Sequence, residues 1–206
     1  VRATVDPLLP KLFSVKPKAD FEIRLVEPFR EASSSSGSYQ GPPQDGSRPG
    51  IFYVNAYDLK ARPRYAMESL YLHEATPGHH FQIALQRELT ELPAFRRFGG
   101  ETAYNEGWGL YAESLGKELG VYTDPAMYFG ALSAELWRSI RLVTDTGIHA
   151  KGWTRQQVLD FMYANSAVEP AVAISEAERF MAIPGQALAY KIGELKIKQL
   201  RGLATA

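Results

Sequence analysis

The stretch from residue 64 to residue 89 reads RYAMESLYLHEATPGHHFQIALQREL. Its residues Met67, Leu70 and Tyr71 recur at helical intervals, and FQIALQREL continues the helical pattern after a break at Pro77-Gly78. Proline and glycine inside a helical pattern break or bulge the helix. The stretch therefore predicts two consecutive helices joined by an irregular turn.

Helical signals continue to the end of the chain and include helix caps and capping boxes. The segment NEGWGLYAESLGKELG contains a closely spaced pair of glycines, Gly107 and Gly109, and a long helix is predicted after this segment. The predicted helix boundaries are, in chain order, the C-terminal cap Gly120, the start Asp124-Pro125, the end at Gly152, the capping boxes Thr154/Gln157 and Ser175/Glu178, and the start after Pro184-Gly185.

The segments before residue 60 predict a small sheet. FEIRLVEP (21–28) alternates apolar and charged residues as a half-buried strand does, and IFYVNAY (51–57) is β-branched and aromatic. Residues 1–20 contain three prolines and predict an extended docking arm, whereas the Ser/Gly/Pro-rich segment 31–50 predicts a flexible loop. We expect one domain over 1–206, mainly α (α+β), with a β-sheet of two or more strands near its N-terminal part.

Composition narrows the classes of partner and ligand. Lys plus Arg number 23 and Asp plus Glu number 23, so no net field attracts nucleic acid. There is no cysteine, so any metal must bind to histidine and carboxylate side chains. No apolar run approaches the length of about 20 residues that a transmembrane helix needs. Because the first residue is Val1, we expect the chain to be part of a longer protein.

The run HEATPGHH (73–80) holds the residues that predict chemistry. Three of the four histidines, His73, His79 and His80, lie within it beside Glu74. In the usual zinc peptidase helix, two histidines one turn apart bind the metal, and a glutamate next to the first acts as base. Here position 77 is proline, and the next histidine comes six residues after the first. We expect the turn to return His79 to the metal, with His80 as the alternative ligand.

A third ligand is expected on the next helix, because two histidines leave zinc in need of a carboxylate and an open position. We favour Glu106, since Gly107 and Gly109 would let the helix backbone approach the site closely. Glu113 is expected on the same helix face, either as a hydrogen-bond partner of a ligand or as a substitute for Glu106. A solvated helix surface is the ordinary alternative for each carboxylate.

Four blocks of the sequence resemble one bacterial family, the domain of unknown function 885. They are HEATPGHHFQ, YNEGWGLYAESLGKELG, RLVTDTGIHAKGWT and IPGQALAYKIG, in the family's order, and the resemblance begins with LPKLF and SRPGIFYVN. Members look like distant relatives of the zinc peptidases whose third ligand is glutamate. The resemblance implies a zincin-like catalytic domain with one Zn²⁺, forming the C-terminal part of a longer protein whose missing N-terminal region is a further partner.

The expected reaction is zinc-dependent hydrolysis of a peptide or related small amide, with Glu74 as general base. The alternative is a catalytically inactive fragment that binds metal or serves as a scaffold. A periplasmic or cell-envelope location is favoured over the cytoplasm. The remaining candidates are Tyr190 and His149 as oxyanion donors, Asp145 as the carboxylate that orients a histidine ligand, Arg179 as a clamp for a substrate carboxylate, and Asn55 as a substrate contact on a strand with a free edge.

Overall fold

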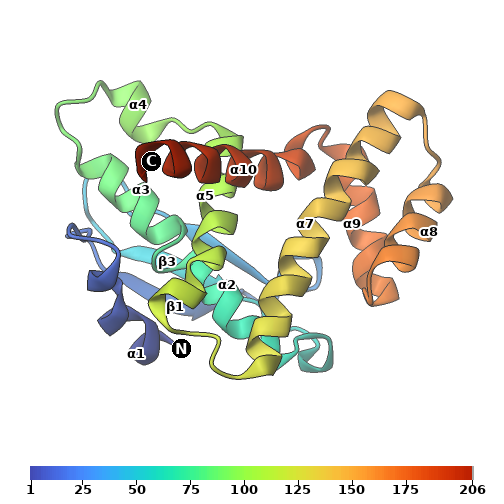
Figure 1. Cartoon of the computed structure of the whole chain (residues 1–206), viewed down its shortest axis with the longest axis horizontal. Coiled ribbons are helices and arrows are strands. Elements are labelled where there is room, and N and C mark those ends of the chain that lie inside the picture. Colours follow the sequence, from blue (N-terminus) through green and yellow to red (C-terminus); the bar gives the residue numbers. More distant parts are fainter. Residues whose placement is uncertain (206) are drawn as a thin grey trace.

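The computed structural model describes residues 1–205, and the chain is mainly helical with one small sheet, as the sequence predicted. Figure 1 shows α10 crossing α5, with α2 between α5 and α7 and the sheet behind them. The helices are α1 (Arg2–Val5), α2 (Met67–Glu74), α3 (His79–Glu88), α4 (Ala94–Phe98), α5 (Thr102–Ser114), α6 (Gly116–Leu119), α7 (Pro125–Lys151), α8 (Arg155–Asn165), α9 (Pro170–Ala182) and α10 (Gln186–Thr205), with 3-10 turns η1 (Asp6–Lys11), η2 (Glu31–Ser33), η3 (Leu59–Ala61) and η4 (Arg64–Ala66).

The sheet contains three strands in the order β1-β3-β2. Strand β1 (Phe21–Leu25) runs parallel to β3 (Gly50–Val54), and β2 (Gly37–Gln40) runs antiparallel to β3. The prediction that β3 offers a free edge was therefore wrong, because both of its edges are paired. Segment 31–50, predicted as a loop, contributes η2 and strand β2, whose pairing with β3 supplies the backbone hydrogen bonds that its composition did not suggest.

The first twenty residues are more helical than their prolines suggested. Helix α1 leads into η1, where Pro7 lies in the first turn and needs no backbone donor. Val5 and Leu9 are buried in the core beside the sheet. The segment docks onto the domain as expected, but it does so as short helical turns.

Five of the six predicted helix boundaries are confirmed, including Gly120, which ends α6 in the left-handed region, and Gln186, which begins α10 directly after Pro184-Gly185. The Asp124 side chain accepts a hydrogen bond from the amide of Ala126, and Gly152 ends α7 in the left-handed region. Thr154 and Gln157 form the predicted capping box of α8, a type of contact that contributes about 1 kcal/mol. The prediction at Ser175 was wrong, because α9 already begins at Pro170, where proline fits the first turn.

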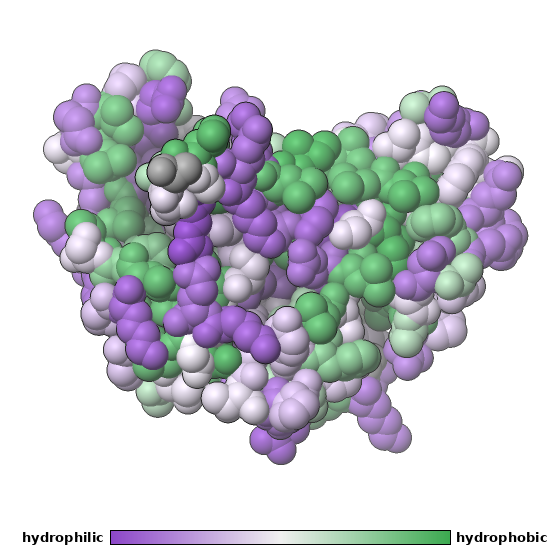
Figure 2. All heavy atoms as spheres, in the orientation of Figure 1, coloured by the Kyte–Doolittle hydropathy of each residue, from purple (hydrophilic) through white to green (hydrophobic). Residues whose placement is uncertain are grey.

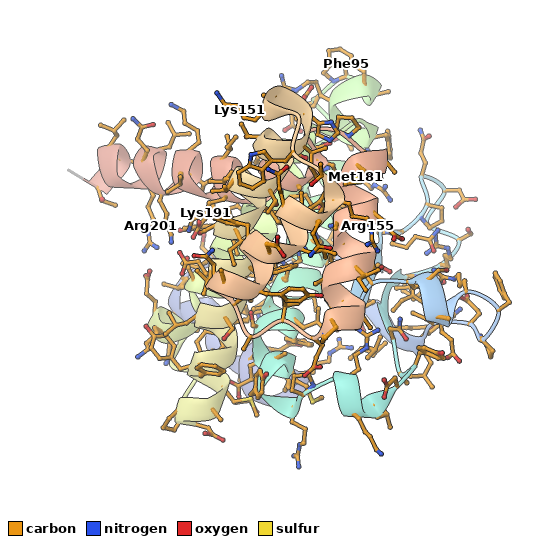
Figure 3. The ribbon with its side chains drawn as sticks, turned by 90° about the vertical axis from the view of Figure 1, so that its right-hand side faces the viewer. Phe95, Lys151, Arg155, Met181, Lys191 and Arg201 are labelled. Atoms are coloured by element: carbon orange, nitrogen blue, oxygen red, sulfur yellow. The ribbon has the colours of Figure 1, made fainter. Side chains whose placement is uncertain are left out.

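Apolar side chains form two core clusters. The larger one joins the sheet, α1, α2, α3 and α5, and the smaller one joins α7, α8 and α9 around Met162 and Phe180. Figure 3, seen from the side of α8 and α9, shows Arg155 near the start of α8, where it pairs with Glu178 of α9 at 2.8 Å. Figure 2 shows further apolar surface around the junction of α10 and α7, helices that carry exposed residues such as Leu136.

Candidate metal centre

Three side chains from three helices converge on one point between α2, α3 and α5. His73 lies near the end of α2, His79 begins α3, and Glu106 lies on α5. Oε2 of Glu106 is 3.5 Å from Nε2 of His73 and 3.4 Å from Nε2 of His79. These distances exceed those of good hydrogen bonds. They match the separation of roughly 3.4 Å between two ligands of a tetrahedral ion with bonds about 2.1 Å long, so the three residues fit zinc.

The turn between α2 and α3 brings His79 to this point. Helix α2 ends at Glu74 and α3 begins at His79, with a cis peptide bond between Thr76 and Pro77. A side chain at Gly78 would collide with the carbonyl oxygen of His73, so only glycine fits. Trp108 of α5 donates a hydrogen bond from Nε1 to the carbonyl of Pro77 at 2.8 Å. The predicted interruption is thus a tight turn that α5 supports.

The open choice between His79 and His80 is resolved by the direction of the two side chains. His80 lies away from the ligand cluster, with Nδ1 2.8 Å from the hydroxyl of Tyr39 and its ring packed 4.6 Å from that of Phe21. Burial lowers the pKa of His80 to about 4. His80 is therefore a neutral core residue, and it does not belong to the ligand cluster, for which it was the alternative.

Glycines let α5 approach the cluster, as the sequence suggested. A Cβ atom at Gly109 would lie 2.6 Å from Cε1 of His73, closer than carbon atoms pack. A side chain at Gly107 would collide with the backbone of Gly193, which lets α10 cross α5 at close range. Both positions therefore require glycine, one for the ligand and one for the helix crossing.

Glu113 is the hydrogen-bond partner of the Nδ1 nitrogen of His73. Its Oε1 lies 2.7 Å from Nδ1 of His73, and its other oxygen accepts a short hydrogen bond from Ser69. Arg138 of α7 pairs with the same carboxylate at 3.2 Å. A hydrogen bond at Nδ1 leaves Nε2 as the free lone pair that a metal needs. Glu113 thus orients a histidine ligand and is not itself in the ligand cluster.

Asp145 does not orient a histidine. Its carboxylate is buried and accepts from the amide of Gly185 at 3.1 and 3.3 Å, so it holds the turn that begins α10. The prediction was wrong because residue spacing located Asp145 on the inner face of α7 but did not show which part of the chain that face meets.

The charges within the site are strongly coupled. Burial opposes ionisation of Glu106, but His73 and His79 outweigh it and lower the pKa of the carboxyl group. For Glu113, burial is likewise outweighed, first by the charge of Arg138 and then by His73, and the pKa falls. Burial lowers the pKa of His73, yet Glu106 and Glu113 raise it to about 9. The carboxylates of Glu106 and Glu113 thus stabilise a positive charge on His73. A bound metal cation would be stabilised by the same two carboxylates.

Glu74 follows the first ligand in the chain and is 7% exposed. Among residues 1–205, no side chain or backbone group forms a hydrogen bond with its carboxylate. A buried carboxylate without a fixed partner is available to accept a proton from a substrate or water.

Tyr190 and Arg179 both lie near the cluster, and both contact Gln186, a residue that the sequence analysis missed. The Tyr190 ring stacks with that of His73 at 6.2 Å between centres. Gln186 donates from Nε2 to Tyr190 at 3.1 Å and to Glu106 at 3.3 Å. Its Oε1 accepts from Arg179 at 2.8 Å. Its position directly after Pro184-Gly185, at the start of α10, was the one sequence feature that set Gln186 apart, and it did not show which segment the side chain meets.

Two predicted site residues have other partners. His149 is hydrogen bonded through Nε2 to the carbonyl of Phe180 at 2.9 Å and so ties α7 to α9. Asn55 is 2% exposed and donates to the carbonyls of Glu31 and Ser34. His149 as an oxyanion donor and Asn55 as a substrate contact were therefore wrong, because both side chains are used to fix loops and helices.

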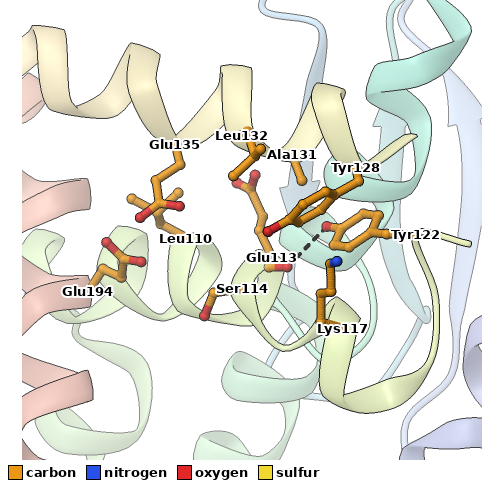
Figure 4. A pocket seen from close by; sticks show the side chains of 10 residues that line it. All are labelled: Leu110, Glu113, Ser114, Lys117, Tyr122, Tyr128, Ala131, Leu132, Glu135 and Glu194. Atoms are coloured by element: carbon orange, nitrogen blue, oxygen red, sulfur yellow. Dashed lines mark hydrogen bonds between the residues drawn. The ribbon is translucent and has the colours of Figure 1, made fainter. Parts of the chain in front are cut away.

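Glu113 also lines a cavity of about 140 Å³ between α5 and α7 (Figure 4). The Tyr122 hydroxyl at its edge donates to the Glu113 carbonyl at 3.0 Å. Two further carboxylates, Glu135 and Glu194, line it, and both pair with Lys191 at 2.6 Å. The cavity therefore adjoins Glu113, the residue that supports the ring of the candidate ligand His73.

Comparison with known families gives a match over nearly the entire sequence. The profile described as "Bacterial protein of unknown function (DUF885)" matches residues 2–206. The chain belongs to this family. No curated protein shows a significant match.

Two solved structures are similar to this DUF885 chain. One is described as a "putative lipoprotein" from Colwellia psychrerythraea, with 43% identity, a TM-score of 0.95, and coverage of 98% of this chain and 35% of that protein. The other, a "putative lipoprotein of unknown function" from Shewanella oneidensis, has 22% identity, a TM-score of 0.76, and coverage of 98% and 38%. The chain thus spans little more than a third of these relatives. None of the helices in residues 1–205 is long and apolar enough to cross a membrane.

Proposed function

We propose that this DUF885 chain is a zinc-dependent hydrolase of peptide or related amide bonds, with a zincin-like site. The observation that carries the proposal is the triad His73, His79 and Glu106, in which the carboxylate lies at tetrahedral spacing from both histidines. Glu74 follows the first candidate ligand and has no hydrogen-bond partner within residues 1–205. Zinc supplies Lewis-acid chemistry, since it polarises a carbonyl group and makes a water molecule acidic at neutral pH.

Three side chains of the protein, Glu74, Tyr190 and Gln186, carry out proton transfer and stabilise the developing charge. Glu74 accepts the proton of the attacking water and later delivers it to the leaving amine. Tyr190 donates a hydrogen bond from its phenolic hydroxyl to the substrate carbonyl oxygen as charge develops there, a contribution of typically about 10² to 10³ in rate. Burial and the nearby charge of Glu106 raise the pKa of Tyr190, which keeps the hydroxyl protonated at neutral pH. Gln186 holds the hydroxyl in position.

The relatives suggest where the reaction takes place. Both are described with the words "putative lipoprotein", and we infer a cell-envelope location for this chain on that similarity. A scaffold that merely binds metal is the competing function. It has no need of a proton acceptor beside its ligand, so the free Glu74 favours catalysis.

Hydrolysis of a mixture of short peptides tests the proposal. Wild-type protein with zinc is expected to release new amino termini, and Glu74→Gln is expected to lose at least 10²-fold in kcat while keeping the metal. Glu91→Gln, at an exposed position, is the matched control and should behave as wild type. Equal rates for Glu74→Gln and Glu91→Gln would contradict the proposal.

A further inference from the structure

Three arginines gather beside the ligand cluster. The guanidinium carbons of Arg138 and Arg141 lie 5.7 Å and 4.7 Å from the centre of the Tyr190 ring. Arg179 donates to Gln186, whose own amide donates to Glu106. The three side chains come from α7 and α9, and one intervening side chain separates each of them from a candidate ligand. These intervening side chains are Glu113, Tyr190 and Gln186.

Two carboxylates, Glu176 and Glu113, form ion pairs with these arginines. Arg141 and Arg179 share one partner, Glu176, through contacts of 2.7 Å to each of its oxygens. Arg138 pairs with Glu113, which His73 and Ser69 also use. Within residues 1–205, Glu176 and Glu113 are the carboxylates that pair directly with these arginines, and Arg141 shares its one partner with Arg179.

Arg141 has unused hydrogen-bond donors for an anionic group. Its side chain is 9% exposed and uses Nη2 for Glu176. Nε is buried, and neither it nor Nη1 has a hydrogen-bond partner in the part of the chain that the structure describes. A buried guanidinium with unused donors is costly, because its lost hydration is not replaced. A carboxylate is the group that a planar guanidinium binds best, through two parallel hydrogen bonds.

We propose that Arg141, supported by Arg138 and Arg179, binds the free C-terminal carboxylate of the substrate. The proposal rests on the proposed hydrolase function and names its substrate class: short peptides cleaved near the carboxyl end. The Tyr190 ring centre is 4.7 Å from Arg141 and 6.2 Å from the ring centre of His73. The carboxylate and the scissile amide are therefore separated by at most about three extended residues, at roughly 3.5 Å each.

Binding without turnover tests this directly. Glu74→Gln protein is titrated by calorimetry with trialanine, with trialanine amide, and with the C-terminal amide of Ala-Ala-Asp. Trialanine is expected to bind about ten-fold or more tightly than its amide, the usual gain from a charged hydrogen-bonded pair. Equal affinities for trialanine and its amide would overturn the proposal. If only the C-terminal amide of Ala-Ala-Asp bound tightly, the proposal would also be overturned, because the arginines would then bind a side-chain carboxylate and not the C-terminal one.

Variants at Arg141 link the preference to the residue. In the Glu74→Gln background, Arg141→Met is expected to reduce the preference to less than three-fold. Arg141→Lys keeps the charge but lacks the two-pronged geometry, and should retain part of the preference if the protein remains folded by circular dichroism. A preference that is unchanged in both variants would contradict the role of Arg141.

A metal-free arm separates this inference from the proposed function. A peptide carboxylate can also bind zinc directly, so the titrations are repeated after removal of metal. We expect the preference for trialanine over its amide to persist without zinc, and its disappearance would overturn the inference. A persisting preference in a protein that hydrolyses no peptide would instead contradict only the hydrolase function.

Discussion

Oε1 of Glu113 lies 2.7 Å from Nδ1 of His73, and both side chains are 4% exposed. This contact fixes the orientation of the His73 ring through Nδ1, while Nε2 faces the other candidate ligands. Because α5 carries both Glu113 and Glu106, one helix supplies a ligand and the support of another ligand. Zinc affinity should therefore depend on Glu113 although Glu113 does not belong to the ligand cluster.

Glu113→Gln is expected to lower zinc affinity by about 10- to 100-fold, the usual effect of losing such a partner. The amide keeps the shape of the side chain but removes the charge that pairs with Arg138. The measurement is a competition titration with a metal chelator at neutral pH. An unchanged zinc Kd in a folded Glu113→Gln protein would show that the contact has no influence on the ligand.

Gly109→Ala is expected to displace the His73 ring, because the added carbon would lie 2.6 Å from Cε1. We expect at least a ten-fold loss of zinc affinity and a lower Tm, since the ring and α5 must separate. Gly202→Ala is the matched control, because nothing lies within 4 Å of its added carbon on α10. Equal behaviour of the two variants would mean that α5 does not pack against His73 as described.

His80 predicts a pH dependence of stability that is separate from metal binding. Its pKa is about 4 in the folded protein, against 6.5 for an ordinary histidine. The unfolded chain therefore binds more protons between these values, and metal-free protein should lose up to about 3 kcal/mol of stability as the pH falls from 6.5 to 4. Urea unfolding of wild type and His80→Gln across this range isolates the contribution. Parallel pH profiles for the two proteins would count against a buried neutral His80.

The cluster of candidate ligands was predictable from the sequence because its signals are local. His73, His79 and Glu74 lie in one short run, and the proline-glycine break explained their spacing. Glu106 followed from the glycines beside it, which now have visible partners in His73 and α10. The helix caps were equally local and were read correctly at Asp124 and Thr154.

The residues that were misassigned depend on contacts between distant segments. His149 and Asp145 lie on the expected face of α7, but that face meets α9 and the turn before α10 instead of the ligands. Strand β2 was hidden in a segment of loop-like composition, because pairing with β3 forms it and its own residues do not favour it. Gln186 could not be selected from spacing, since it reaches Glu106 only when α10 crosses α5.

Zinc content of the purified chain tests the central claim most directly. We predict about one zinc per chain by elemental analysis at neutral pH, with loss of the metal in Glu106→Gln and retention in Glu101→Gln, whose exposed side chain lies just before α5. Wild-type protein without zinc after incubation with the metal, or a Glu106→Gln protein that binds as much zinc as Glu101→Gln, would contradict the site.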